Sequence, residues 1–220
     1  MKISDMSNTS LRILTAGIMI GILVVVALLS AYYPKMHIVR WLGVAVMCGA
    51  LYEMIISMVK SGIENVQKNS VLYFMFTMWL IIMLSAAYYV GLRPKIMLWM
   101  LMIIVGADVG AWFFGKTFGG DKMWEKISAN KTWAGQIGGI FCGTLMSVLY
   151  FKIFGGYLSN AIWIGISAAL LSQYGDLTAS YIKRTMGIKD FGNLLPGHGG
   201  ILDRFDGWIY VLPLIWFMIS

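Results

Sequence analysis

The stretch Ser180–Asp206 reads SYIKRTMGIKDFGNLLPGHGGILDRFD and is the most polar and irregular part of a strongly apolar chain. Charged residues make up only 12% of the sequence, yet acids, bases and a histidine crowd together here between glycines and a proline. Irregular backbone beside membrane-spanning helices is tolerated only where it is buried in protein or lines a water-filled cavity. We therefore expect this stretch to carry the chemistry of the protein.

The rest of the chain has the composition of a membrane protein. Of its 220 residues 59% are hydrophobic, and the mean hydropathy is +0.76. A soluble domain holds nearer half apolar residues and a quarter charged ones. The apolar runs are continuous rather than alternating, which disfavours a membrane β-barrel. The net charge of +7 fits basic loops against anionic lipid headgroups, and no basic stripe with interleaved aromatics indicates nucleic-acid binding.

Runs of about twenty apolar residues are long enough to cross a bilayer and predict about seven transmembrane helices. They are Leu11–Tyr33, Ile38–Ser57, Val71–Val90, Ile96–Gly115, Gly135–Phe154, Ala161–Ala179 and the shorter Gly207–Ser220. The expected fold is an all-α polytopic membrane protein with a polar active-site cavity on the cytoplasmic side. We treat residues 1–220 as one integral membrane domain, with N-terminal spans at 11–95 and a catalytic part at 96–220 that contains the signature 180–206.

The distribution of lysine and arginine predicts the orientation of these helices. Most of these residues lie in the N-terminal tail and in the second, fourth and sixth loops, whereas the first, third and fifth loops hold fewer. Positive loops stay in the cytoplasm, which places the N-terminus and the two largest loops there. Some of these lysines are themselves candidate site residues, and the excess of positive charge on this side is smaller when they are left out.

Asp108 lies in the C-terminal half of the fourth apolar segment, within IIVGADVGAWFFG. A carboxylate at that depth costs about 2.5–3.5 kcal/mol on insertion scales, so such residues usually mark a site or a pathway. The alternative is that Asp108 lies near enough to the interface to be hydrated. Flanking glycines at 106, 110 and 115 permit close approach of another helix or of a ligand.

The loop that follows, KTFGGDKMWEKISANKTWAG, combines glycines with lysines and hydroxyl side chains, among them Ser128, Lys131 and Thr132. Such a flexible cationic segment suits phosphate oxygens, which bind backbone N–H groups and ammonium charges. A basic loop that only sets the orientation is the alternative.

The sixth apolar segment ends in LLSQYGDLTASYIKR, where Ser172, Asp176, Ser180 and Arg184 recur at steps of four. If the helix continues through this sequence, these residues share one face, with Lys183 beside it. Lipid contact or core packing explains such a face poorly. It suits a polyanionic ligand held through a metal ion.

Acids and bases thus gather on the predicted cytoplasmic side. The acids are Asp108, Asp176, Asp203 and Asp206, and the bases are Lys131, Lys183, Arg184, Lys189, Arg204 and His198. Hard carboxylate oxygens suit Mg²⁺, which takes one or two carboxylates plus phosphates and waters. Metal and cations together neutralise the charge that develops during phosphoryl or nucleotidyl transfer.

The stretch Ser180–Asp206 resembles the signature of phosphatidate cytidylyltransferases, also called CDP-diacylglycerol synthases. That signature runs S-x-x-K-R, then K-D, then a glycine- and proline-containing link into H-G-G-x-x-D-R-x-D. The residues that match at the same spacing are Ser180, Lys183, Arg184, Lys189, Asp190, His198, Gly199, Gly200, Asp203, Arg204 and Asp206. The Asp108 segment and S-x-N-K-T-W-x-G at Ser128–Gly135 also match, so the resemblance covers about Gly106 to the C-terminus.

The resemblance implies a nucleotidyltransferase of phospholipid biosynthesis, which forms CDP-diacylglycerol and pyrophosphate from CTP and phosphatidate. It implies Mg²⁺, or another divalent cation, on Asp176, Asp203 and Asp206. The implied catalytic residues are Asp176, Lys183, Arg184, Asp203, Arg204 and Asp206. The implied substrate-binding residues are Asp108, Ser128, Lys131, Thr132, Ser180, Lys189, His198, Gly199 and Gly200.

The implied partners are CTP, phosphatidate and the lipid bilayer, with no nucleic acid, and a homodimer is left open. We expect an integral protein of a bacterial inner membrane whose active site faces the cytoplasm, where CTP is found. Three positions depart from the family pattern: Ala129 replaces a usual proline, and Ala134 and Ala179 replace usual acids. The alternatives are a CTP-dependent kinase of a polyprenol-like alcohol, a transporter, and an inactive scaffold.

Overall fold

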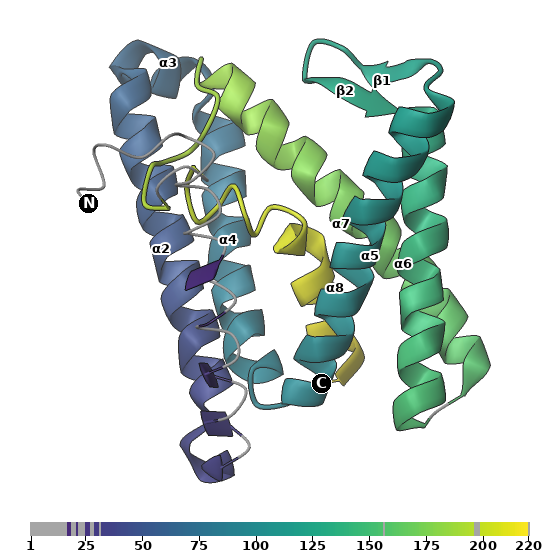
Figure 1. Cartoon of the computed structure of the whole chain (residues 1–220). Helices are drawn as coiled ribbons and strands as arrows, with labels where there is room; N and C mark the ends of the chain where they lie inside the picture. The colour runs from purple at the N-terminus through teal and green to yellow at the C-terminus, as the bar shows by residue number, and fades with distance from the viewer. Residues whose placement is uncertain are drawn as a thin grey trace, which may run out of the picture. The chain divides into compact units, whose positions relative to one another are not determined.

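The computed structural model describes residues 17–18, 21, 25–26, 29–30, 32–155, 157–195 and 199–219. Its elements are the 3₁₀-helix η2 (Pro34–Met36), α2 (Ile38–Ser61), α3 (Ile63–Lys68), α4 (Ser70–Val90), α5 (Pro94–Phe118), β1 (Lys122–Trp124), β2 (Ser128–Thr132), α6 (Trp133–Phe154), α7 (Leu158–Thr185) and α8 (Trp208–Ile219) (Figure 1). The chain forms two compact units, Met1–Leu92 with Thr185–Phe205, and Arg93–Arg184 with Asp206–Ser220.

Four of the predicted spans are confirmed as long apolar helices. Within the described residues, α2, α4, α5 and α6 have the length and hydropathy to cross a membrane. The predicted segment Ala161–Ala179 lies inside α7, which is helical but more polar, and the last segment forms the short α8 around Pro213. The predicted first span, Leu11–Tyr33, lies largely outside the described residues. The protein is therefore an integral membrane protein, and the count of seven spans stays a prediction.

Local sequence explains where these helices begin and end. Pro94 opens α5, where a missing N–H costs nothing, and Gly119 ends it with φ +60°. The Thr132 hydroxyl accepts a hydrogen bond from Gly135 N at 3.1 Å and caps the start of α6. Gly155, with φ +84°, ends that helix. The boundaries of the helices that carry the site thus follow from individual residues.

In the first unit, α2 and α4 run side by side (Figure 1). Gly43 of α2 leaves room for Ala87 of α4, and Arg40 lies over the ring of Tyr88, 4.4 Å from its centroid. The buried Tyr73 directs its hydroxyl to Asn65 Oδ1 at 3.1 Å. The two helices therefore form a packed pair, closed at one end by α3.

In the second unit, small residues let α5 and α6 pack closely (Figure 1). A Cβ on Gly110 would lie 2.6 Å from Cys142 Cβ, and one on Gly106 would lie 3.2 Å from the Cys142 carbonyl. Small residues at a helix interface allow such approach, which is how helices associate within lipid. The glycines around Asp108 thus serve contact with a helix, one of the two roles that the sequence left open.

The prediction of an all-α fold fails at one place. The loop after α5 forms an antiparallel hairpin in which Lys122 pairs with Thr132 and Trp124 with Ser128. Both strands are short, and each contains a lysine, which has a low strand propensity, beside the tryptophan or threonine that favours a strand. The segment expected to be flexible is therefore hydrogen-bonded, and it delivers Lys131 from a fixed strand.

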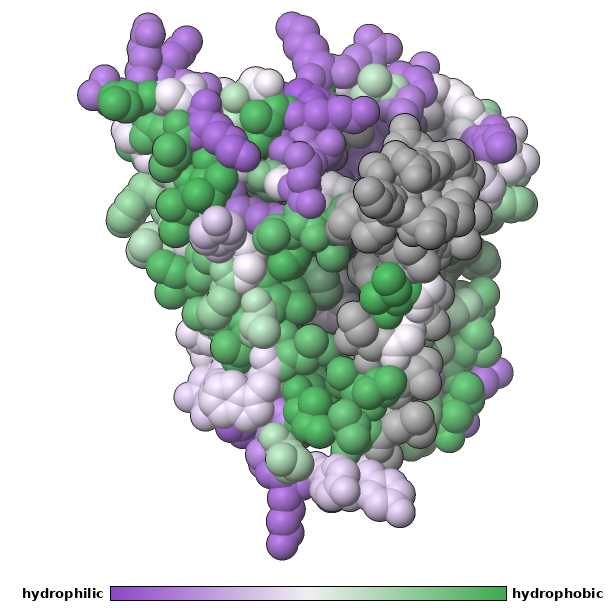
Figure 2. Space-filling model, turned by 60° about the vertical axis from the view of Figure 1, so that its left-hand side comes forward, coloured by the Kyte–Doolittle hydropathy of each residue, from purple (hydrophilic) through white to green (hydrophobic). Residues whose placement is uncertain are grey.

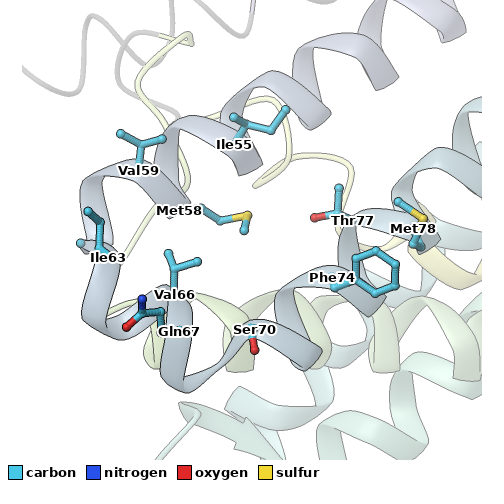
Figure 3. A pocket seen from close by; sticks show the side chains of 11 residues that line it. Ile55, Met58, Val59, Ile63, Val66, Gln67, Ser70, Phe74, Thr77 and Met78 are labelled. Carbon is cyan, nitrogen blue, oxygen red and sulfur yellow. The ribbon is translucent and has the colours of Figure 1, made fainter.

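The surface of the described residues has the apolar character that lipid requires. Phe74, Trp112 and Phe141 are all more than 60% exposed, and Figure 2 shows broad green areas of apolar side chains on the face in view. A hollow of about 540 Å³ lies between α2, α3 and α4 and is lined by side chains such as Ile55, Met58 and Phe74 (Figure 3). Its lining includes none of the predicted site residues, so the site is not this hollow.

Candidate active site

Asp176 of α7 is the centre of an acid–base cluster in the second unit. Its Oδ2 lies 2.5 Å from the ammonium of Lys131, which β2 presents. Lys131 Nζ also donates to the carbonyl of Gln173 at 3.4 Å, one turn earlier on α7. Both side chains of the ion pair are partly exposed, at 37% for Asp176 and 24% for Lys131. The pair therefore stays accessible to a polar ligand.

The predicted polar face of α7 is confirmed because the helix continues to Thr185. The Ser180 hydroxyl donates to Asp176 Oδ1 at 3.4 Å, one turn along, and Ser172 is buried one turn before. Lys183 is 8% exposed, whereas Arg184 is exposed. Lys183 lies within electrostatic range of Asp206 and acts to lower the pKa of that carboxyl.

Asp206 joins this cluster through close backbone contact. Gly175 of α7 lies against the Asp206 carbonyl, and a Cβ on Gly207 would lie 2.9 Å from Ser172 Oγ. Gly207 N donates to Asp206 Oδ1 at 2.8 Å. Two glycines next to two aspartates thus bring Asp176 and Asp206 to the same place.

Burial raises the pKa of the Asp206 carboxyl from 3.8 to about 8. The negative charges of Asp176 and Asp108 raise the pKa further, while Lys183 and the Gly207 N–H oppose the shift. Asp206 precedes α8 and lies outside the four apolar spans. The neutral form of this carboxyl is therefore favoured at neutral pH even with Lys183 nearby, and a metal ion that binds there must displace the proton.

The remaining predicted residues of the second unit lie on α5 and on the hairpin. Asp108 is within electrostatic range of Asp176 and Lys131, so it belongs to the cluster. Thr132 is buried and caps α6, and Ser128 pairs with Trp124 in the hairpin. The structure thus gives Thr132 a structural role, and its predicted contact with substrate stays a prediction.

The signature loop, residues 186–205, belongs to the first unit and is organised around Asp203. Asp203 Oδ2 accepts hydrogen bonds from Phe191 N at 2.9 Å and from Gly200 N at 3.0 Å. Gly199, with φ +84°, faces the carboxyls of Asp203 and Asp190, and its carbonyl accepts from Leu195 N at 2.9 Å. The described residues of the loop are therefore folded around the carboxylate of Asp203.

The signature loop also carries four other predicted site residues. Lys189 and Arg204 are exposed, and Gly200 donates its N–H to Asp203. His198 lies outside the described residues. The structure thus groups Asp108, Lys131, Asp176, Lys183 and Asp206 in one unit and Lys189, Gly199, Gly200, Asp203 and Arg204 in the other.

The predicted metal ligands divide in the same way, since Asp176 and Asp206 belong to the second unit and Asp203 to the first. Among the described residues, no three acidic, histidine or cysteine side chains form a group that would hold a metal by themselves. Mg²⁺ typically binds one or two carboxylates and completes its shell with phosphates and waters. Asp176 and Asp206, two partly buried acids whose charges repel, fit such a partial shell.

Two functional candidates on α2 were missed by the sequence analysis. Glu53 is 2% exposed and its Oε2 accepts from Leu202 N at 2.9 Å, while Ser57 Oγ donates to the Phe191 carbonyl at 2.6 Å. A single acid inside an apolar span, as in GALYEMIISM, was the available signal, because such residues are functional candidates by default.

The chain combines apolar helices with an acid–base cluster in one unit and a glycine-rich loop in the other. The model of the cytidylyltransferase family matches residues 1–220. The chain therefore belongs to the cytidylyltransferase family.

Individual relatives agree with this assignment. The phosphatidate cytidylyltransferase of Rickettsia bellii is 35% identical over 230 residues, which cover 99% of this chain and 93% of that protein. The enzymes of the same name from Staphylococcus aureus strain COL and Staphylococcus haemolyticus are 45% and 42% identical over 120 residues. Those matches cover 54% of this chain, and the chain spans 46%, about half, of the staphylococcal proteins.

Proposed function

We propose that the chain transfers the cytidylyl group of CTP to phosphatidate and so forms CDP-diacylglycerol and pyrophosphate. The observation that carries this proposal is the cluster of Asp108, Lys131, Asp176, Lys183 and Asp206 in a chain of the cytidylyltransferase family. It joins carboxylates for a cation with ammonium groups for phosphates, as nucleotidyl transfer requires.

In the proposed reaction, a phosphate oxygen of phosphatidate forms a bond to the α-phosphorus of CTP. The bond from that phosphorus to the oxygen bridging it to the β-phosphorus breaks, and pyrophosphate leaves with the electron pair. The attacking oxygen is already anionic, so the site needs no strong general base. Lys131 and Lys183 would bind the phosphates and stabilise the charge that develops on the leaving pyrophosphate.

Mg²⁺, or another divalent cation, is the cofactor that we propose, held by Asp176, Asp206 and Asp203. When bound, it supplies Lewis-acid stabilisation of the phosphate oxygens. Asp206 would lose its proton to accept the cation, and Asp176 would keep its ion pair with Lys131. Arg184, Lys189 and Arg204 would bind substrate phosphates from the exposed surface, and Gly199 and Gly200 would let the backbone approach the nucleotide.

The arrangement in the membrane is part of the proposal. Seven helices would span the bilayer, and the polar site would form a cavity open to the cytoplasm. The support is the excess of lysine and arginine in the loops on that side and the match to bacterial relatives. A bacterial inner membrane is the expected location.

The test of the proposed function is an assay of the purified chain in detergent with CTP, Mg²⁺ and either phosphatidate or a polyprenol. We expect CDP-diacylglycerol from phosphatidate, identified by mass spectrometry, and no product from the alcohol. Phosphorylation of the alcohol without any CDP-lipid would replace the proposal by a CTP-dependent lipid kinase.

The raised pKa of Asp206 predicts that Mg²⁺ binds more tightly as the pH rises. Below about pH 8 the cation must displace a proton from this carboxyl, so the apparent affinity should increase up to about tenfold per pH unit between pH 6 and 8 and then level off. Titration calorimetry without nucleotide measures this, and Asp206→Asn should flatten the dependence. An affinity that does not change between pH 6 and 8 in the wild-type protein contradicts the role of Asp206.

A further inference from the structure

A buried carboxylate stands where the signature loop meets a membrane-spanning helix. Glu53 of α2 is 2% exposed, and its Oε2 accepts the N–H of Leu202 at 2.9 Å. Among the described residues, no hydrogen-bond partner pairs with Oε1. Glu53 belongs to none of the clusters described above, so its presence within an apolar span needs its own explanation.

The loop backbone lies against this carboxylate at two separate points. A Cβ on Gly192 would lie 2.5 Å from Glu53 Oε1 and 2.8 Å from its Cδ, and a Cβ on Gly200 would collide with Oε2. A side chain at either position would therefore force the Glu53 carboxylate to shift. The carboxylate and the two glycines form one complementary contact.

Glu53 and Asp203 contact the same two parts of the loop, residues 191–192 and residues 200–202. Asp203 Oδ2 accepts from Phe191 N, next to Gly192, and from Gly200 N, and Gly200 is also a residue that lies against Glu53. One turn along α2, Ser57 Oγ donates to the Phe191 carbonyl at 2.6 Å. Two polar side chains of α2 thus hold both arms of the loop at the place where Asp203 lies between them.

We propose that Glu53 is a positioning residue that fixes the signature loop on α2 and thereby sets the orientation of Asp203 and Arg204. Its carboxylate accepts the hydrogen bond of Leu202 N, and its side chain fills the space against which Gly192 and Gly200 pack. Its negative charge is not required for this role. The effect on turnover rests on the proposed function, whereas the effect on loop order does not.

Replacing Glu53 by leucine or by glutamine distinguishes its role as a hydrogen-bond acceptor from its role in packing. Glu53→Gln keeps a carbonyl oxygen for Leu202 N, while Glu53→Leu keeps a similar volume without an acceptor and suits a membrane helix. We expect Glu53→Gln to keep kcat within about threefold and Glu53→Leu to lose about 10- to 100-fold, the usual effect of removing a partner that orients a ligand-binding side chain. Thermal unfolding in detergent shows whether each variant is folded.

A size exchange tests the contact with the loop directly. Gly192→Ala should lower kcat because its methyl group contacts the Glu53 carboxylate. In a Glu53→Ala background the carboxylate is gone, so the same change should lower kcat by no more than about twofold. Such non-additivity is expected for residues in contact. Gly43→Ala on the same helix is the control, because its Cβ would lie 3.6 Å from Ala87 Cβ, an ordinary contact. Independent, multiplying effects of the Gly192 and Glu53 changes would overturn the proposal.

Hydrogen exchange provides a readout that does not need activity. Peptides covering residues 188–206 should exchange faster in Glu53→Leu than in the wild type and at the wild-type rate in Glu53→Gln, with the α4 peptides unchanged. If the wild type forms no CDP-lipid, the proposed function fails while this comparison still decides the role of Glu53. Equal loop exchange in the leucine and glutamine variants, or wild-type turnover in the leucine variant, would overturn the proposal.

Discussion

Replacement of Asp176 by asparagine is expected to lower kcat by about 10³-fold or more, which corresponds to about 4 kcal/mol of lost transition-state stabilisation. Asp176 is paired with Lys131 at 2.5 Å, and its charge acts on both Asp108 and Asp206. The amide has nearly the same size but carries no negative charge. It therefore removes a proposed metal ligand and the counter-charge of Lys131 together.

The size of this effect should be specific to the cluster. Asp121→Asn makes the same chemical change at an exposed carboxylate and should keep kcat within about twofold. Initial rates at saturating CTP, phosphatidate and Mg²⁺, with thermal unfolding to show that both variants are folded, measure the difference. A folded Asp176→Asn protein with at least a third of wild-type turnover would remove Asp176 from the site.

A similarly large loss is expected for Asp203→Asn, but without a loss of stability. The asparagine carbonyl oxygen can accept the same hydrogen bonds from Phe191 N and Gly200 N that Asp203 Oδ2 accepts now. The loop should therefore keep its conformation, while the negative charge proposed for the metal is gone. We expect kcat to fall by about 10³-fold with the unfolding temperature unchanged.

Asp203→Ala is the comparison that separates the two roles of this carboxylate. Alanine leaves two backbone N–H groups without their acceptor, which costs about 1–3 kcal/mol for each one that stays buried and unpaired. This variant should lose both turnover and thermal stability. Wild-type turnover in Asp203→Asn would limit Asp203 to the structural role and take it out of the proposed metal site.

Much of the fold could be predicted because membrane helices follow simple rules of length and hydropathy. Continuous apolar runs identified α2, α4, α5 and α6 to within a few residues, and the spacing of Ser172, Asp176 and Ser180 identified the polar face of α7. The hairpin was not predicted, because strands as short as β1 and β2 leave almost no periodic pattern.

The candidate site was predictable in its chemistry and less so in its arrangement. The sequence indicated Asp108, Asp176 and Asp206 as acids of one site, and the structure brings their charges together. The sequence could not show that Thr132 caps a helix or that Glu53 meets Gly200, which lies 147 positions later in the printed sequence. Contacts between distant residues depend on tertiary packing, and the pattern of a single sequence does not contain it.

The transfer of a cytidylyl group, rather than a terminal phosphoryl group, is the central claim, and the position of a radioactive phosphorus tests it directly. The purified chain is incubated with phosphatidate, Mg²⁺ and CTP labelled at either the α- or the γ-phosphorus, and the lipid is then extracted. The account predicts that the α label enters the lipid and the γ label leaves as pyrophosphate. Lipid that carries the γ label and not the α label would contradict it.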